Sequence, residues 1–195
     1  MAEQKRPYLY EESSEPFFQM DIKKDKVARY LHVALNTLSL EALNPQSSWK
    51  IVDLAQRSEV SRTWIYENFG KNHEQILKLA TEIVCKELNS ISEKRTEIRE
   101  KFGSLGNILR SRKIFRLYPE VILFYYRYRL DQGEVGEIIR ASEKDLVKLL
   151  EKVTKFQGHT LVEFLALSHG LSTALFLTDE QVSECFNKRM ADYKV

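Results

Sequence analysis

Helix-breaking residues are rare in this chain, and their positions leave long stretches free of them. The 195 residues contain only seven glycines and four prolines, namely Pro7, Pro16, Pro45 and Pro119. A β-sandwich needs many turns, and turns draw heavily on both residue types. Apolar residues make up 43% of the composition, enough for a buried core and too many for a disordered chain. We therefore expect an all-α fold.

Apolar residues recur at spacings of three and four between these breaks, which is typical of amphipathic helices. The predicted helices cover about 25–43, a short segment ending near 57, 62–69, 72–101, 108–118, a segment from 119 to the turn at 131–133, 137–156, 160–177 and 178–190. Capping residues are expected at Ser47 or Ser48, Ser61, Asn72, Thr160 and Thr178. Gly103 and Gly106 predict a break, and the apolar run 121–126 predicts a helix buried on all sides.

Residues 51–69 predict two short helices joined by a tight turn. Only Glu59 and Val60 separate the second predicted helix from Ser61, which is placed to cap the third. Together with the helix at 25–43, this layout describes a helix-turn-helix unit, whose last helix fits the major groove of DNA. The pattern therefore indicates a DNA-binding function.

The stretch IVDLAQRSEVSRTWIYENFGK resembles the DNA-binding domain of TetR-family transcriptional regulators. The matching positions are Ile51, Asp53, Leu54, Ala55, Val60, Ser61, Ile65, Tyr66 and Phe69. The resemblance strictly covers about residues 25–80. Four positions depart from the family pattern, because Glu59 replaces its turn glycine, Trp64 a small residue and Asn72 a lysine, while Glu67 adds negative charge.

The resemblance places the DNA contacts on and beside the third helix. Arg62 and Thr63 open that helix, where side chains reach base edges, and Tyr66 matches a tyrosine that reaches phosphate. The alternative is that Arg62 and Thr63 are ordinary solvated residues. Trp64 belongs either to the groove contact or to a hydrophobic surface shared with the tail. The full set of expected DNA-binding residues is Lys50, Ser61, Arg62, Thr63, Trp64, Tyr66 and Lys71.

Aromatic residues are concentrated between positions 102 and 128, in the part of the chain that corresponds by layout to the effector cavity of the family. Core packing is the default explanation for such a cluster. The sharper hypothesis is an apolar pocket for a hydrophobic or aromatic small molecule, which leaves an anionic one open. His169, an isolated imidazole in an apolar helix, is either a core or interface residue or a ligand contact. The expected pocket residues are Phe115, Tyr118, Tyr125, Tyr128 and His169.

The helices 137–156 and 160–177 are expected to form a homodimer. Small residues recur every fourth position in the second of them, and the segment 167–177 resembles the apolar, glycine-containing helix that ends many family members. Such a dimer would present two recognition helices to a palindromic operator. The alternative is a monomer that buries this face on its own helices. The expected interface residues are Ile139, Leu146, Leu150, Ala166, Gly170 and Ala174.

Other classes of function find little support in the sequence. Cys85 and Cys185 have no metal-ligand spacing and are expected to be buried thiols, and the four histidines include no pair at i, i+4. No nucleophile motif or phosphate loop stands out, so neither an enzyme nor a cofactor is expected. There is no apolar leader and no apolar run of membrane-spanning length, so we expect a cytoplasmic protein without a membrane partner.

The sequence thus predicts residues 1–22 as a tail, 23–71 as a helix-turn-helix domain and 72–195 as a helical effector-binding and dimerisation domain. The expected function is a TetR-like transcriptional regulator, most simply a repressor released from DNA by a small ligand. The alternative is a helical ligand-binding or protein-interaction module that has kept this fold and lost operator recognition. Glu59, Glu67 and Asn72 favour the alternative.

Overall fold

The fold is all-α, as predicted. The computed structural model describes residues 25–44, 49–89 and 93–193, and within them it contains nine helices and no strand. In chain order these are α1 (Lys26–Leu43), α2 (Ile51–Arg57), α3 (Arg62–Asn68), α4 (His73–Asn89), α5 (Glu93–Leu117), α6 (Glu120–Tyr128), α7 (Glu134–Thr154), α8 (Gly158–Thr173) and α9 (Asp179–Asp192). The predicted tail, residues 1–22, lies outside the described residues.

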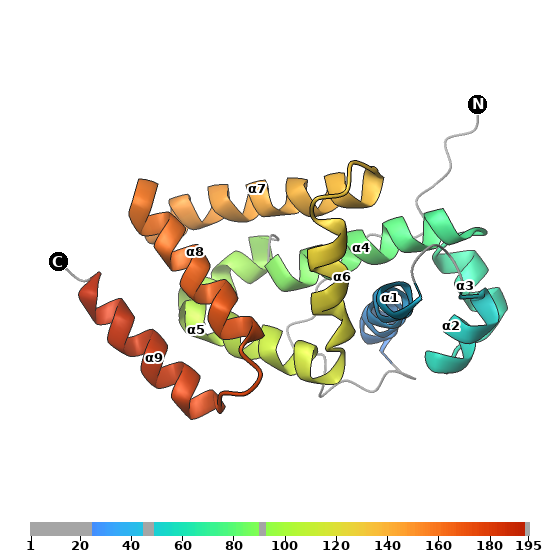
Figure 1. Ribbon diagram of the computed structural model, residues 1–195, viewed down its shortest axis with the longest axis horizontal. Helices are drawn as coiled ribbons and strands as arrows, with labels where there is room; N and C mark the ends of the chain where they lie inside the picture. The colour runs from blue at the N-terminus through green and yellow to red at the C-terminus, as the bar shows by residue number, and fades with distance from the viewer. Residues whose placement is uncertain (1–24, 45–48, 90–92, 194–195) are drawn as a thin grey trace.

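Two apolar clusters hold the helices together. The first surrounds α1, which lies between α6 and the α2–α3 pair and also packs along α4 (Figure 1). Almost every residue of α1 from Ala28 to Ala42 is buried. The second cluster joins α5, α7, α8 and α9 at the opposite end of the molecule, around Phe164 and Val182. The elongated body therefore has the short helices α2 and α3 at one end and α8 and α9 at the other.

Several predicted helix ends are confirmed by their caps. Asp25 caps α1 by accepting a hydrogen bond from the Ala28 N–H at 2.9 Å. The Ser61 hydroxyl accepts from the Trp64 N–H and starts α3, as predicted. Thr178 forms the expected capping box with Gln181 at the start of α9. These short-range signals can be recognised in sequence because donor and acceptor lie within three residues of each other.

Other predicted boundaries are wrong. The helix expected over 72–101 is two helices, α4 and α5, and Gly103 and Gly106 lie inside α5. A glycine costs a helix interior only about 1 kcal/mol, which the packing of Ile108 and Ile114 offsets. The N-cap residue of α2 is Lys50, whose N–H donates to the Asp53 carboxylate, while Ser47 and Ser48, which were expected to cap this helix, lie outside the described residues.

The boundaries of α8 also differ from the prediction. It begins after Gln157, without the expected Thr160 cap, and it ends at Thr173 and not at Leu177. At this end the Arg112 guanidinium donates to the carbonyl oxygens of Leu171, Ala174 and Leu177, which gives these backbone acceptors a partner. The chain therefore leaves the helix and wraps around one buried side chain.

Two predictions of burial are wrong. Val121 and Phe124 of α6 are buried, but Leu123 and Tyr126 are 56% and 55% exposed, because α6 covers the body with only one face. Cys185 is exposed, whereas Cys85 is half-buried beside α7. None of the described helices has both the length and the apolar character of a membrane span.

Candidate functional site

The α2–α3 unit presents one face to solvent and buries the other. Ile65 and Leu54 are fully buried against α1, which fixes how α3 lies on the body. Between the two helices Glu59 has φ +53°, a left-handed conformation that glycine adopts more readily. The Val60 N–H donates to the Ala55 carbonyl at 3.1 Å and closes this turn. Glu59 therefore takes the backbone conformation of a turn glycine without being one.

Most of the expected DNA-binding residues share the exposed side of this unit. Arg62, Thr63 and Tyr66 lie on the outer face of α3, and their neighbour Glu67 is exposed beside them. The residues exposed in this region include Lys50, Ser61, Arg62, Thr63, Tyr66 and Lys71. The seven expected residues thus lie at one end of the molecule, and six of them are exposed there.

Trp64 is the exception. Its ring packs edge-on against Tyr30 of α1, with 5.1 Å between the ring centroids, and it also lies beside Phe69. The Arg29 guanidinium lies 5.9 Å from the centre of the indole. Trp64 therefore joins α3 to α1, and its half-buried ring belongs to the packing of this unit.

A buried carboxylate joins this unit to the rest of the protein. Glu41 of α1 is 1% exposed, and its Oε2 lies 2.8 Å from Trp49 Nε1 and 2.7 Å from His73 Nε2. The hydroxyl of Tyr128, on α6, donates to the other carboxylate oxygen. One side chain therefore ties α1 to the entry of α2, the start of α4 and the end of α6. Sequence analysis did not single out Glu41, although a lone acid in the apolar run LSLEAL is a usable signal.

A second polar bridge holds the opposite end of α6. The Tyr118 hydroxyl lies 2.6 Å from His32 Nδ1 of α1, and burial lowers the pKa of His32 and raises that of Tyr118 to about 12. Arg57 of α2 donates to Asn36 and pairs with Glu120 of α6 at 3.5 Å. Tyr118 and Tyr128, both expected in the pocket, thus connect α1 with the region around α6 and do not line the cavity.

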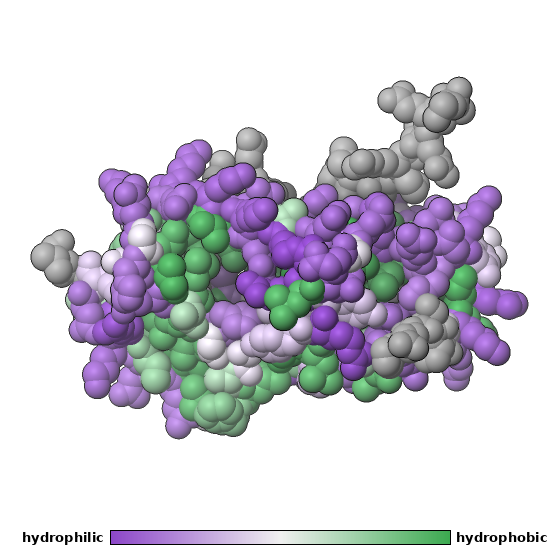
Figure 2. All heavy atoms as spheres, turned by 45° about the horizontal axis from the view of Figure 1, so that its top comes forward, coloured by the Kyte–Doolittle hydropathy of each residue, from purple (hydrophilic) through white to green (hydrophobic). Residues whose placement is uncertain are grey.

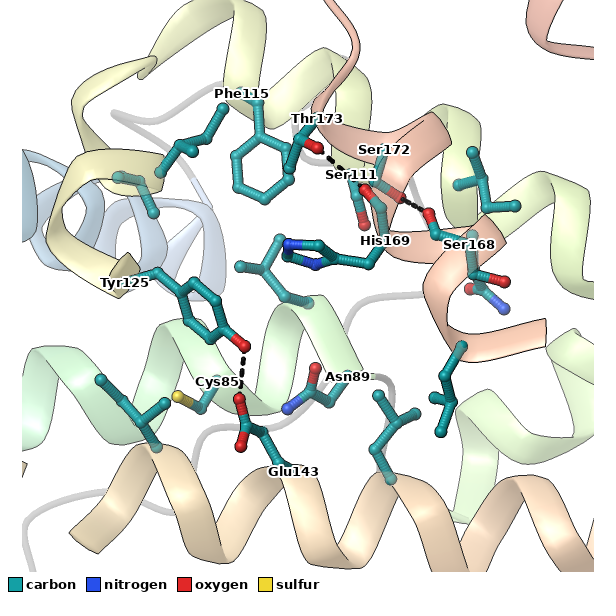
Figure 3. A pocket seen from close by; sticks show the side chains of 18 of the residues that line it. Cys85, Asn89, Ser111, Phe115, Tyr125, Glu143, Ser168, His169, Ser172 and Thr173 are labelled. Atoms are coloured by element: carbon teal, nitrogen blue, oxygen red, sulfur yellow. Dashed lines mark hydrogen bonds between the residues drawn. The ribbon is translucent and has the colours of Figure 1, made fainter. Parts of the chain in front are cut away.

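A cavity of about 370 Å³ lies among α4, α5, α6, α7 and α8. Three of the five expected pocket residues, Phe115, Tyr125 and His169, line it. In Figure 3 the phenol of Tyr125 and the imidazole of His169 extend from α6 and α8 into the same space. Most of the remaining lining is hydrocarbon, including Ile108, Ile122 and Leu165.

The polar groups of this cavity include residues that the sequence pattern did not reveal. Glu143 of α7 accepts from the Tyr125 hydroxyl and, at 2.7 Å, from Arg129 Nε. His169 Nε2 lies 2.8 Å from the exposed Tyr126 hydroxyl, and burial lowers the pKa of this imidazole. Glu143 gave no signal in sequence, because a glutamate on an amphipathic helix is usually solvated.

The expected dimer residues separate into two groups. Ile139, Leu146 and Leu150 of α7 line the cavity, and Ile139 and Leu150 are buried within their own protomer. On α8 Ala166 and Gly170 are exposed, and Ala174 follows the helix half-buried. Val162 and Phe176 are 63% and 87% exposed in the same region. Figure 2 shows hydrophobic residues gathered over this end, whereas the α2–α3 end is mostly hydrophilic.

Comparison of the chain with models of protein families, with curated proteins and with solved structures gave no match. In the described part of the chain, no group of three or more histidine, cysteine, aspartate or glutamate side chains is placed to hold a metal ion. Two features remain as candidates for function, namely the exposed face of α3 and the mostly apolar cavity.

Proposed function

We propose that this protein is a DNA-binding transcriptional repressor of the TetR type. In this proposal α2 and α3 form the helix-turn-helix, and a small molecule in the cavity releases the protein from its operator. The observation that carries the proposal is the exposed face of α3, where Arg62, Thr63 and Tyr66 project from a short helix that is anchored to the body by the fully buried Ile65. A helix presented in this way fits the major groove, which is about 12 Å wide.

The charges around α3 support contacts to the DNA backbone on both sides of the groove. Lys50 precedes α2 and Lys71 follows α3, and both side chains are exposed. Phosphate contacts of this kind position a protein on DNA, whereas contacts to base edges select the sequence. We therefore assign base reading to Arg62 and Thr63, and phosphate binding to Lys50, Tyr66 and Lys71.

The proposed partner in the homodimer is a second copy seated on the outer face of α8. The protomer's own helices leave Ala166 and Gly170 uncovered, together with the larger apolar side chains of Val162 and Phe176. Exposed apolar surface of this kind is typical of interaction sites. A two-fold axis here supplies two copies of α3, which a palindromic operator requires at a separation of about 34–36 Å.

The first test concerns DNA binding, measured by mobility shift with the DNA that flanks the protein's own gene. Arg62→Ala is expected to cost about 1–3 kcal/mol on the specific site, because a base edge loses its hydrogen-bonding partner. Lys71→Ala is expected to weaken binding to all DNA sequences alike. It should also reduce by about 1 the slope of log affinity against log salt concentration. Lys148→Ala, on the exposed face of α7, serves as the control and should change neither quantity. Wild-type affinity in both α3-region variants, with folding intact, would reject the assignment.

The second test concerns the dimer. Gly170→Leu is expected to dissociate it, since a larger side chain separates two helices that approach closely. Within one protomer a Cβ added at Gly170 meets no atom within 4 Å, so each subunit should keep its fold. Sedimentation should show twice 22.9 kDa for the wild type and 22.9 kDa for the variant. Lys148→Leu adds the same side chain on α7 and should remain dimeric. A wild-type monomer at micromolar concentration would contradict the proposal.

One observation favours a second candidate function. Glu67 is exposed on the same helix as Arg62 and places a negative charge where phosphates would lie. A helical ligand-binding module that has lost operator recognition would keep the cavity and tolerate this charge. The mobility shift separates the two functions, because only the repressor binds the flanking DNA.

A further inference from the structure

We propose that the cavity takes an uncharged, mostly apolar molecule that carries a hydrogen-bond donor such as a hydroxyl group, and that Glu143 makes it select against carboxylates. The inference rests on the proposed function only in treating the cavity as the effector site. It concerns the chemical class of the ligand, and it favours an uncharged molecule over the anionic one that the sequence left open.

The walls of the cavity set the first condition, which is an apolar body. Side chains such as Ile108, Phe115, Ile139 and Leu150 enclose it from α5 and α7. Its volume of about 370 Å³ lies in the range of small-molecule sites. Because a charge moved from water into such surroundings loses its hydration, a charged ligand needs a compensating partner inside the cavity.

The polar corner formed by Tyr125, Arg129 and Glu143 sets the second condition. The Tyr125 hydroxyl and Arg129 Nε both donate to the same carboxylate oxygen of Glu143, Oε1. The other oxygen, Oε2, has no hydrogen-bond partner among the described residues. A carboxylate with a spare acceptor favours a ligand that donates, and a ligand carboxylate has no proton to donate at neutral pH.

The charges of the lining give no compensation for an anion. Arg129 is the only described lining residue that is cationic at neutral pH, and Glu143 neutralises it and raises its pKa. Burial lowers the pKa of His169, which keeps its imidazole neutral, and raises the pKa of Cys85 to about 12, which keeps its thiol protonated. The lining thus holds one positive and one negative charge, already paired.

The α8 side of the cavity offers a second polar contact. The Ser168 hydroxyl is buried there and has no hydrogen-bond partner in the described structure. In Figure 3 Ser168 and Glu143 lie on α8 and α7, with Asn89 between them. An uncharged ligand with one hydroxyl near Glu143 and an acceptor near Ser168 would form hydrogen bonds with both α7 and α8.

The test compares matched probes by isothermal calorimetry at pH 7 without DNA: 2-naphthol with 2-naphthoate, and decanol with decanoate. The wild-type protein is expected to bind each alcohol at least about tenfold more tightly than the matching carboxylate. In Glu143→Gln the carboxylates should gain about tenfold, because Arg129 loses its counter-charge, while the alcohols change less than threefold. Glu137→Gln, an exposed residue of α7 outside the lining, is the control and should leave all four affinities unchanged.

A second variant, Arg129→Gln, shows whether a folding defect explains the behaviour of Glu143→Gln. Arg129→Gln leaves Glu143 unpaired, so it should admit decylamine and reject decanoate more strongly than the wild type does. Equal or tighter binding of the carboxylates by the wild type overturns the proposal, and so does an absence of binding by all four probes. Loss of operator binding with the alcohol preference intact counts against the repressor and leaves this inference standing.

Discussion

Replacement of Arg112 by methionine is expected to lower the free energy of unfolding by about 3–5 kcal/mol, the cost of removing one member of a buried ionic cluster. The Arg112 side chain is fully buried on α5. Its guanidinium donates to Asp179 Oδ1 at 3.0 Å and to the carbonyl oxygens of Leu171, Ala174 and Leu177. Methionine fills much of the volume but donates nothing, so the carbonyl groups at the end of α8 lose their partners.

A matched control is available one helical turn away. Arg116 is also paired with Asp179, at 2.9 Å, but its side chain is 38% exposed. Because exposed ion pairs contribute little, Arg116→Met is expected to cost less than about 1 kcal/mol. Urea unfolding followed by circular dichroism measures both variants. Equal unfolding midpoints for Arg112→Met and Arg116→Met would mean that the buried guanidinium does not hold α8 and α9 in place.

Arg112 also shows where prediction from sequence ends. It lies in the segment ILRSRKIFRL beside other basic residues, and nothing local distinguishes it from a solvated arginine. Its acceptors lie about sixty residues further along the chain, at separations of 59 to 67. The caps at Ser61 and Thr178 could be predicted because all of their partners are near neighbours. A hydrogen bond between residues far apart in the chain leaves no such local pattern in the sequence.

The residues of the candidate site also include some whose role could be predicted from the sequence and others whose role could not. Tyr125 and Tyr128 are three residues apart on α6, and sequence analysis assigned both to the pocket. In the structure Tyr125 lines the cavity and bonds to Glu143, whereas Tyr128, nearly one turn further along α6, bonds to Glu41 of α1. The apolar face of α7 poses the same difficulty, because one periodicity describes a dimer interface and a cavity wall equally well. Periodicity identifies a buried face but not the element that covers it.

The second large effect is expected at Glu41. Glu41→Ala should cost about 3–5 kcal/mol, since it leaves the donors of Trp49, His73 and Tyr128 without their acceptor. Denaturant unfolding measures this loss. Tyr128→Phe removes a single hydrogen bond from the same cluster and should cost only about 1 kcal/mol. A cost below that of Tyr128→Phe would show that the cluster around Glu41 does not hold the helices together.

The variant Tyr128→Phe also tests whether the cavity is coupled to α3. Helix α6 carries Tyr125 into the cavity and Tyr128 to Glu41, and Glu41 in turn holds the entry of α2 through Trp49. A ligand that displaces Tyr125 therefore acts on the helix that is joined to the α2–α3 end, with coupling of about 1–3 kcal/mol in typical cases. In folded Tyr128→Phe, operator affinity without ligand should stay close to that of the wild type, while its ligand-induced loss should shrink. An unchanged response would place the connection elsewhere, with the Tyr118–His32 contact as the next candidate.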